Sequence, residues 1–181
     1  MRLISMICAA VLAAASLTGC DSGRIYNKNY VRAAAVWGDT GSEAVIAFYD
    51  EEDTYSASGR DLQEIIRNTE IGVGKSVFTG HTELIILGEC DYAETLTFLL
   101  NEWRVSPSCQ VVYGGERAAD VLEKLDAEAL ADSVSQAVEQ GRAAPCDIVT
   151  VLGGLLSESG AAEVAKVSEN GFSGTAYITR K

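Results

Sequence analysis

Few side chains in this chain could catalyse a reaction, and His81 is the first to consider. It is the only histidine among 181 residues, and a serine or cysteine nucleophile usually needs an imidazole as its base. No G-x-S-x-G elbow presents a serine for such chemistry. We therefore expect His81 to be a hydrogen-bonded structural residue at the start of the apolar segment Leu84–Leu87. The residues argue against an enzyme.

A glycine-rich segment, Gly72-Val73-Gly74-Lys75-Ser76, is similar to the end of a phosphate-binding P-loop. That motif needs a glycine where Thr69 stands, with a strand before it and a helix after it. Here the apolar spacing before the segment is that of a helix. We interpret the segment as a loop between a helix and a strand, and we expect no bound nucleotide.

The cysteines and acidic residues do not form a recognisable metal or redox motif. Cys90, Cys109 and Cys146 lie outside any CxxC pair or Cys/His cluster, so a zinc site is not expected. We expect all three to be small buried hydrophobic residues, and a Cys109–Cys146 disulfide stays open as an alternative. The four adjacent acids at 50–53 lack the alternation of an EF-hand loop and predict a solvated turn. No metal, flavin or nicotinamide fingerprint is present, and we expect no cofactor.

The N-terminal residues predict covalent chemistry at Cys20. A short basic region at Arg2 and an apolar stretch over 3–15 lead to Leu17-Thr18-Gly19-Cys20, the pattern of a secretory signal peptide with an ending similar to a bacterial lipobox. We expect cleavage after residue 19 and a thioether from Cys20 to diacylglycerol. Several acyl chains would then hold the protein on the outer face of the cell membrane. The alternatives are an ordinary signal peptide with a chance cysteine, or a buried N-terminal helix.

Charge and hydropathy limit the partners of the chain. The formal net charge is −12, and it becomes more negative once Arg2 is removed with the signal peptide. Such a surface repels nucleic acid and anionic lipid headgroups, so lipid and not basic side chains must supply the anchoring. Hydrophobic residues make up 48% of the chain, and beyond the signal no apolar run reaches the roughly 18 residues that span a bilayer. We expect one globular domain.

The spacing of apolar residues and turn signals predicts the elements that hold these side chains. After a tether over 20–30, we expect a hairpin from strands at 31–37 and 44–49, and then an exposed loop at 50–59. A capping box formed by Ser58 and Asp61 would open a helix to about Asn68. Further expected elements are a buried central strand at 84–87, a helix at 92–103, a strand at 111–113, helices at 121–125, 130–138 and 148–156, and a strand at 174–179. The fold class is α+β or mixed α/β: a mixed β-sheet with an N-terminal hairpin and helices packed on it, over residues 31–181.

One local pattern goes beyond composition. Gly80-His81 leads through Glu83 into Leu84-Ile85-Ile86-Leu87-Gly88-Glu89, after a lipobox and a strand and turn from Tyr30 to Gly38-Asp39. This order resembles the N-terminal part of the Ger(x)C family, the lipoprotein C subunits of spore germinant receptors, and the most specific family-motif residues are Gly80, His81, Glu83, Gly88 and Glu89. Residues 172–178 are similar to the strand that begins the family's next module, which is absent here. The family's tryptophan after the lipidated cysteine is also missing, because Asp21-Ser22-Gly23 stands there.

The resemblance implies a non-enzymatic subunit on the outer face of the spore inner membrane. It would assemble with integral-membrane A- and B-type subunits and would be required for nutrient-triggered germination. No catalytic residue is carried over, and only Cys20 receives a defined chemical role. The alternative is an anchored solute-binding lipoprotein of a transporter, although residues 20–181 leave little room for two lobes and a cleft.

Overall fold

A computed structural model describes residues 28–39 and 41–180 of the chain. The expected signal peptide at 1–19, the lipidation site Cys20 and most of the expected tether lie outside the described residues. Among the residues that are described, no helix has the length and apolar composition needed to cross a membrane.

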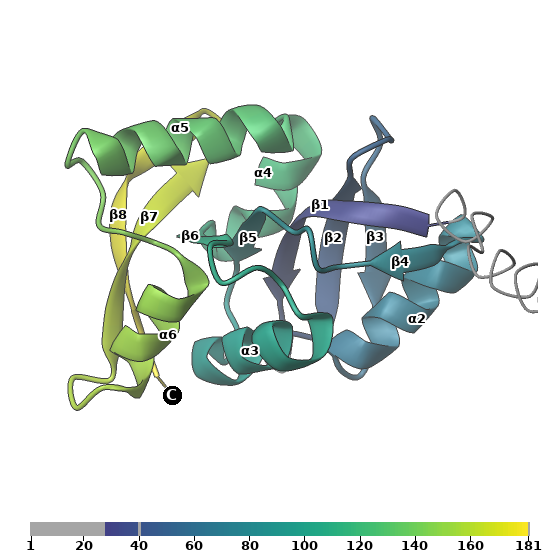
Figure 1. Cartoon of the computed structure of the whole chain (residues 1–181), viewed down its shortest axis with the longest axis horizontal. Coiled ribbons are helices and arrows are strands. Elements are labelled where there is room, and N and C mark those ends of the chain that lie inside the picture. Colours follow the sequence, from purple (N-terminus) through teal and green to yellow (C-terminus); the bar gives the residue numbers. More distant parts are fainter. Residues whose placement is uncertain (1–27, 40, 181) are drawn as a thin grey trace, which may run out of the picture.

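The described residues form one mixed sheet of eight strands (Figure 1). The strands are β1 (Lys28–Trp37), β2 (Glu43–Phe48), β3 (Tyr55–Ser58), β4 (Ser76–Phe78), β5 (Leu84–Leu87), β6 (Gln110–Tyr113), β7 (Ala161–Ser168) and β8 (Gly171–Thr179). Their order is β3-β2-β1-β5-β6-β7-β8, and β4 pairs with the start of β1. Neighbouring strands from β1 through β5 and β6 to β7 are parallel, whereas β2, β3 and β8 are antiparallel to their neighbours.

The centre of the sheet is buried on both faces because its strands carry continuous apolar runs. All four residues of β5 are buried, and so are Ala33–Val36 of β1 beside it. In register, Ala34 pairs with Ile85, which pairs in turn with Val111 of β6. The interior strand predicted at 84–87 is therefore confirmed.

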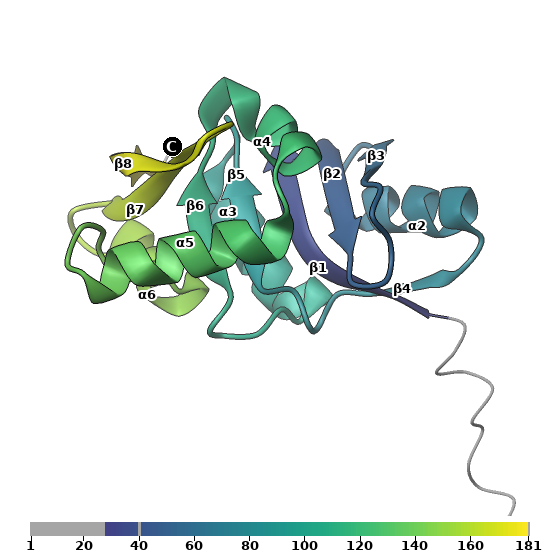
Figure 2. The ribbon, with the colours of Figure 1, turned by 90° about the horizontal axis from the view of Figure 1, so that it is seen from above.

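Helices cover both faces of this sheet and give three layers (Figures 1 and 2). They are α2 (Leu62–Val73), α3 (Tyr92–Phe98) with the π-helix η1 (Leu99–Trp103), the 3₁₀ turn η2 (Gly115–Arg117), α4 (Ala118–Lys124), α5 (Ala127–Glu139) and α6 (Ile148–Leu156). α4 and α5 lie on one face, where α4 packs on β1 and β2, and α5 on β8. α2, α3 and α6 lie on the other. The expected fold class is confirmed.

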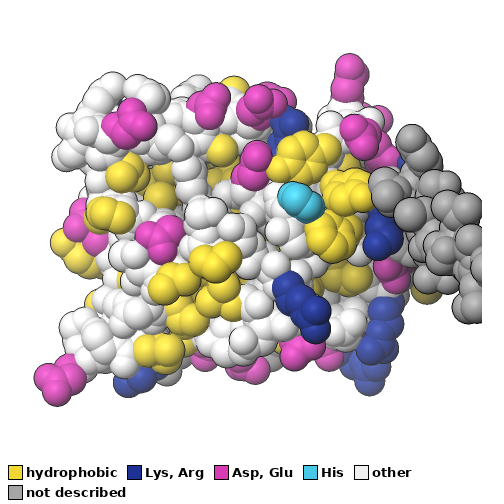
Figure 3. Space-filling model, viewed as in Figure 1, with side chains coloured by type: hydrophobic (Ala, Val, Ile, Leu, Met, Phe, Trp, Pro, Cys, Tyr) yellow, Lys and Arg dark blue, Asp and Glu magenta, His cyan; other side chains and the backbone are white. Residues whose placement is uncertain are grey.

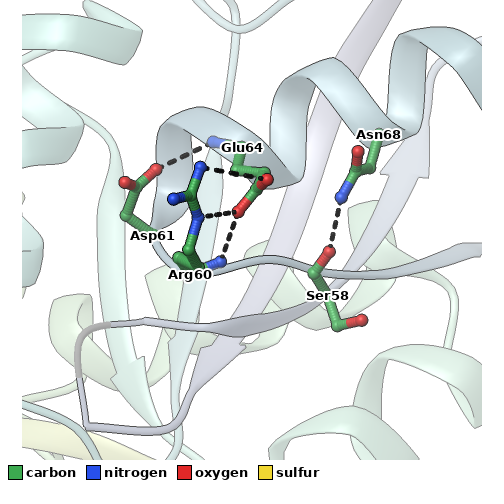
Figure 4. Close-up of polar contacts among 5 residues, drawn as sticks. All are labelled: Ser58, Arg60, Asp61, Glu64 and Asn68. Atoms are coloured by element: carbon green, nitrogen blue, oxygen red, sulfur yellow. Dashed lines mark hydrogen bonds and ion pairs between the residues drawn. The ribbon is translucent and has the colours of Figure 1, made fainter.

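Four helices begin with an aspartate that satisfies the free backbone N–H groups of the first turn. Asp61, Asp91, Asp126 and Asp147 each accept a hydrogen bond from the backbone nitrogen three residues later, at 2.8–3.0 Å. In α2 the Glu64 carboxylate also accepts from the Arg60 backbone nitrogen and guanidinium (Figure 4). The predicted capping box is therefore displaced by three residues: Asp61 caps the helix, and Ser58 ends β3.

Several elements differ from the expectation, in their bounds or because no element was expected there. β1 begins at Lys28 and not at residue 31, because Lys28–Tyr30 pair with β4. The expected loop at 50–59 contains β3, a short polar edge strand. α2 continues to Val73, five residues beyond Asn68, before Gly74 ends it in the left-handed conformation. β4 and β7 were not expected, although the alternation of apolar and polar residues around Glu163 in β7 is typical of a strand.

Candidate functional site

A surface hollow lies where the parallel strands begin. It has a volume of about 780 Å³ and lies between Arg32 in β1, the turn before β5, the turn before β6 and the helix α5. A second hollow of about 540 Å³ shares Arg32 and Tyr49 with the first and extends to the acidic residues 50–52. We call this region the amino edge, because it joins Arg32 of β1 to the residues that precede or open β5 and β6.

Arg32 is the central charged group of the amino edge. One guanidinium nitrogen lies 2.6 Å from a carboxylate oxygen of Glu128 in α5, and the group stacks 4.4 Å from the centre of the Tyr49 ring. The Arg32 Nε is buried and has no hydrogen-bond partner among the described residues. Loss of hydration, followed by the neighbouring Glu83 carboxylate, raises the pKa of Tyr49 to about 12. Tyr49 therefore stays protonated, and its hydroxyl donates to the His81 carbonyl oxygen at 3.0 Å.

Four aromatic side chains gather beside this arginine, and we call them the aromatic patch: Tyr30, Tyr49, Phe78 and His81. Phe78 lies 5.5 Å from Tyr30 and 5.3 Å from His81, measured between ring centres. His81 is exposed and the other three are half-buried. Figure 3 shows the imidazole with hydrophobic side chains next to it on the surface. The patch exists because β4 pairs with the start of β1 and brings Phe78 next to Tyr30.

His81 thus opens the segment before β5, as expected, but its ring lies in an aromatic group. The imidazole contacts Phe78 and Tyr30, and the hydrogen bond at this residue involves the main-chain carbonyl. Cys109 also lines this hollow. Burial raises the pKa of Cys109 to about 12 and that of Cys146 to about 11, so both thiols stay protonated and unreactive at neutral pH.

The structure separates the family-motif residues into two groups at opposite ends of β5. Gly80, His81 and Glu83 precede the strand at the amino edge, whereas Gly88 and Glu89 follow it. A Cβ on Gly80 would lie 2.9 Å from the Phe78 ring, so the absence of a side chain lets that ring pack closely. These five residues do not form one site.

At the far end of β5 the two remaining motif residues hold the strand ends together. Glu89 accepts hydrogen bonds from the Tyr113 hydroxyl at 2.5 Å and the Tyr92 hydroxyl at 3.3 Å. A Cβ on Gly88 would lie 2.6 Å from the Cβ of Trp37 in β1. The hydrogen bond to Glu89, followed by burial, raises the pKa of Tyr113 to about 12. Gly88 and Glu89 therefore have a structural role at this end of β5.

The remaining candidates from the sequence are the P-loop-like segment, the three cysteines and possible metal ligands. The P-loop-like segment runs from the end of α2 through the Gly74 cap into β4, the reverse of the strand-to-helix order that phosphate binding needs. Cys90, Cys109 and Cys146 are buried, and none forms a disulfide, so the open Cys109–Cys146 alternative is wrong. Within the described ranges, no group of three histidine, cysteine or acidic side chains could hold a metal ion.

Sequence reasoning missed Arg32, Glu128 and Gln110 as parts of one surface. Gln110 opens β6, and its side-chain nitrogen donates to the Ser135 hydroxyl of α5 at 2.6 Å. One signal for Arg32 was present, because it is the only charge within the apolar segment 31–36. No comparable signal placed α5 beside it.

Comparison with known families gives one result. Residues 38–168, more than half of the chain, match the family described as "Spore germination protein N-terminal domain". The matched range runs from the end of β1 to the end of β7 and so includes most of the sheet and its covering helices. No curated protein and no solved structure matches the chain.

Proposed function

This chain belongs to the family of spore germination protein N-terminal domains, and we propose on that premise that it is a non-enzymatic subunit of a spore germinant receptor. The match over residues 38–168 carries the proposal. It confirms the resemblance to the N-terminal part of the Ger(x)C family. Membership of a germinant receptor family implies association with a membrane.

The proposal also includes how the subunit attaches to the membrane and which proteins it contacts. Leu17-Thr18-Gly19-Cys20 supports lipidation of Cys20 after signal cleavage, which would attach the subunit to the outer face of the spore inner membrane. The subunit would act by contact with integral-membrane A- and B-type subunits and be required for nutrient-triggered germination. The geometry favours binding over chemistry, because the imidazole lies among aromatic rings and the thiols are buried.

A deletion strain tests this proposal. Spores without the gene should lose germination with one set of nutrients and keep their other germination routes, and the parental gene should restore the lost response. The A- and B-type membrane subunits should co-purify with the protein from detergent extracts. Normal germination with every nutrient, together with lost uptake of a solute, would replace the proposal with the solute-binding lipoprotein.

A further inference from the structure

We propose that the aromatic patch (Tyr30, Tyr49, Phe78 and His81) rests in the headgroup region of the bilayer, so that the amino edge of the sheet faces the membrane. The inference rests on the lipid anchor at Cys20 that is part of the proposed function. It adds an orientation for the domain and names the lipid surface as the partner of the patch.

The length of chain between the anchor and the fold restricts that orientation. Eight residue steps separate Cys20 from Lys28, the first described residue of β1, and a fully extended chain spans at most about 3.6 Å per step, or about 29 Å. A domain of this size is about 40 Å across, from the usual scaling of radius of gyration with length. The side of the domain that carries Lys28 therefore cannot be the side farthest from the membrane.

The aromatic patch lies on that same side. The Lys28 ammonium nitrogen is 5.6 Å from the centre of the Phe78 ring, and Tyr30, two residues further along β1, packs edge-on against the same ring. β8, with its exposed Tyr177, lies at the opposite end of the sheet (Figures 1 and 2). When the tether holds Lys28 near the bilayer, it therefore holds the patch near the bilayer as well.

The chemistry of the patch suits the boundary between headgroups and acyl chains. Tyrosine has an apolar ring and a polar hydroxyl, and such side chains concentrate at membrane interfaces. The cations of Lys28 and Arg32 lie over the rings of Phe78 and Tyr49, at 5.6 and 4.4 Å. A positively charged group beside a half-buried ring can bind lipid phosphate while the accessible edge of the ring contacts the interface.

Two of the carboxylates near the patch have partners, which reduces part of the local negative charge. Glu51 accepts a hydrogen bond from Asn29 at 2.8 Å and lies 3.6 Å from the Lys75 ammonium. Glu128 is paired with Arg32. The remaining negative charge predicts that anionic lipids do not strengthen the contact, so a zwitterionic bilayer is the matching surface.

Fluorescent labels at two positions test the orientation. The lipidated full-length protein is placed on phosphatidylcholine vesicles without other receptor subunits, and an environment-sensitive NBD label is attached at His81→Cys or, as the matched control, at Tyr177→Cys. His81 is exposed and Tyr177 is 73% exposed, so neither change removes a core side chain. The parental protein measures background labelling, which the buried thiols should keep low.

We expect the label at position 81 to shift its emission to the blue on vesicles and to be quenched by brominated acyl chains. The label at position 177 should do neither, and Tyr30→Ser should weaken the quenching at position 81. Vesicle flotation without a shift at position 81, or equal quenching at both positions, overturns the inference and leaves the anchor intact. A shift that needs the membrane subunits would make the patch a protein interface and overturn it too. Loss of flotation would overturn the anchor and the inference together.

Discussion

Arg32 in β1 and Glu128 in α5 meet at 2.6 Å although 96 residues separate them in the sequence. The pair connects β1, an interior strand of the sheet, to the helix that covers the amino edge. Glu128 is 64% exposed on its side chain, while Arg32 is only 21% exposed and stacks on Tyr49. Solvent screens the charge attraction, so we expect the stacking of the arginine to contribute more than the ion pair.

Two substitutions separate these contributions. Glu128→Gln should reduce the free energy of unfolding by less than about 1 kcal/mol, the usual value of a screened surface pair. Arg32→Ala should cost about 1–2 kcal/mol, because it also removes the packing and cation–π contact with Tyr49. Urea unfolding at low and high salt measures both. An equal loss in the two variants would contradict this ranking.

The cap of α2 can be tested by comparing Asp61 with Ser58. Asp61→Ala should cost about 1 kcal/mol, since its carboxylate satisfies the Glu64 backbone nitrogen at 2.9 Å. Ser58→Ala should have little effect, because only its main-chain carbonyl is used, by the Asn68 side chain (Figure 4). Thermal melts of both variants are sufficient. If Ser58→Ala were the more harmful change, the capping assignment would be wrong.

Gly88 has a structural role that a matched glycine can isolate. Gly88→Ala should destabilise the protein by about 1–3 kcal/mol, because the new methyl group would meet Trp37 at 2.6 Å and the Gly115 carbonyl oxygen at 3.1 Å. Gly153→Ala in α6 meets nothing within 4 Å and should be neutral or stabilising, since alanine favours a helix. Denaturant midpoints would show the contrast, and equal midpoints would refute it.

The interior position of β5 predicts a large effect of charge. Ile86 is completely buried, so Ile86→Asp should cost several kcal/mol through an unpaired buried carboxylate. Ile71 in α2 is 80% exposed, and Ile71→Asp is the control, with an expected change below about 0.5 kcal/mol. Calorimetric melting temperatures measure both. A melting temperature for Ile86→Asp close to that of the parent would place the strand at the surface.

Lipidation is tested at Cys20 itself. In Cys20→Ala, labelling with a fatty-acid analogue should vanish, and the protein should be secreted or remain unprocessed, because alanine has no thiol to form the thioether. Membrane fractionation and radiolabelling provide the measurement, with the parental protein as reference. Unchanged labelling and fractionation would show that another residue or another mechanism attaches the chain.

The central elements could be predicted because their residue types indicate burial or the start of a helix. Four consecutive apolar residues predict burial of β5 on both faces, and an aspartate before a helical spacing predicts the start of α6 at Asp147. Edge elements could not. β3 and β4 are short and partly polar, and their strand character comes from pairing with β2 and β1 and not from their own sequence.

The candidate site could likewise be predicted only in the part that depends on local sequence. His81 was identified because it is unique, and its position before β5 was predicted correctly. Its aromatic neighbours were not, since Tyr30, Tyr49 and Phe78 lie on three different segments that only the β1–β4 and β1–β2 pairings bring together. Arg32 and Glu128 meet through helix packing that no local pattern records.

The central place of β1 affects how the chain must fold as it is made. β1 pairs with β2 on one side and with β5 on the other. It is synthesised early, yet its parallel partner β5 begins only at Leu84. Until then the apolar Ala33–Val36 segment has an unpaired backbone edge, a known risk for aggregation. Because distant pairings slow folding, a chain released early would benefit from a chaperone that holds β1 until the sheet can close around it.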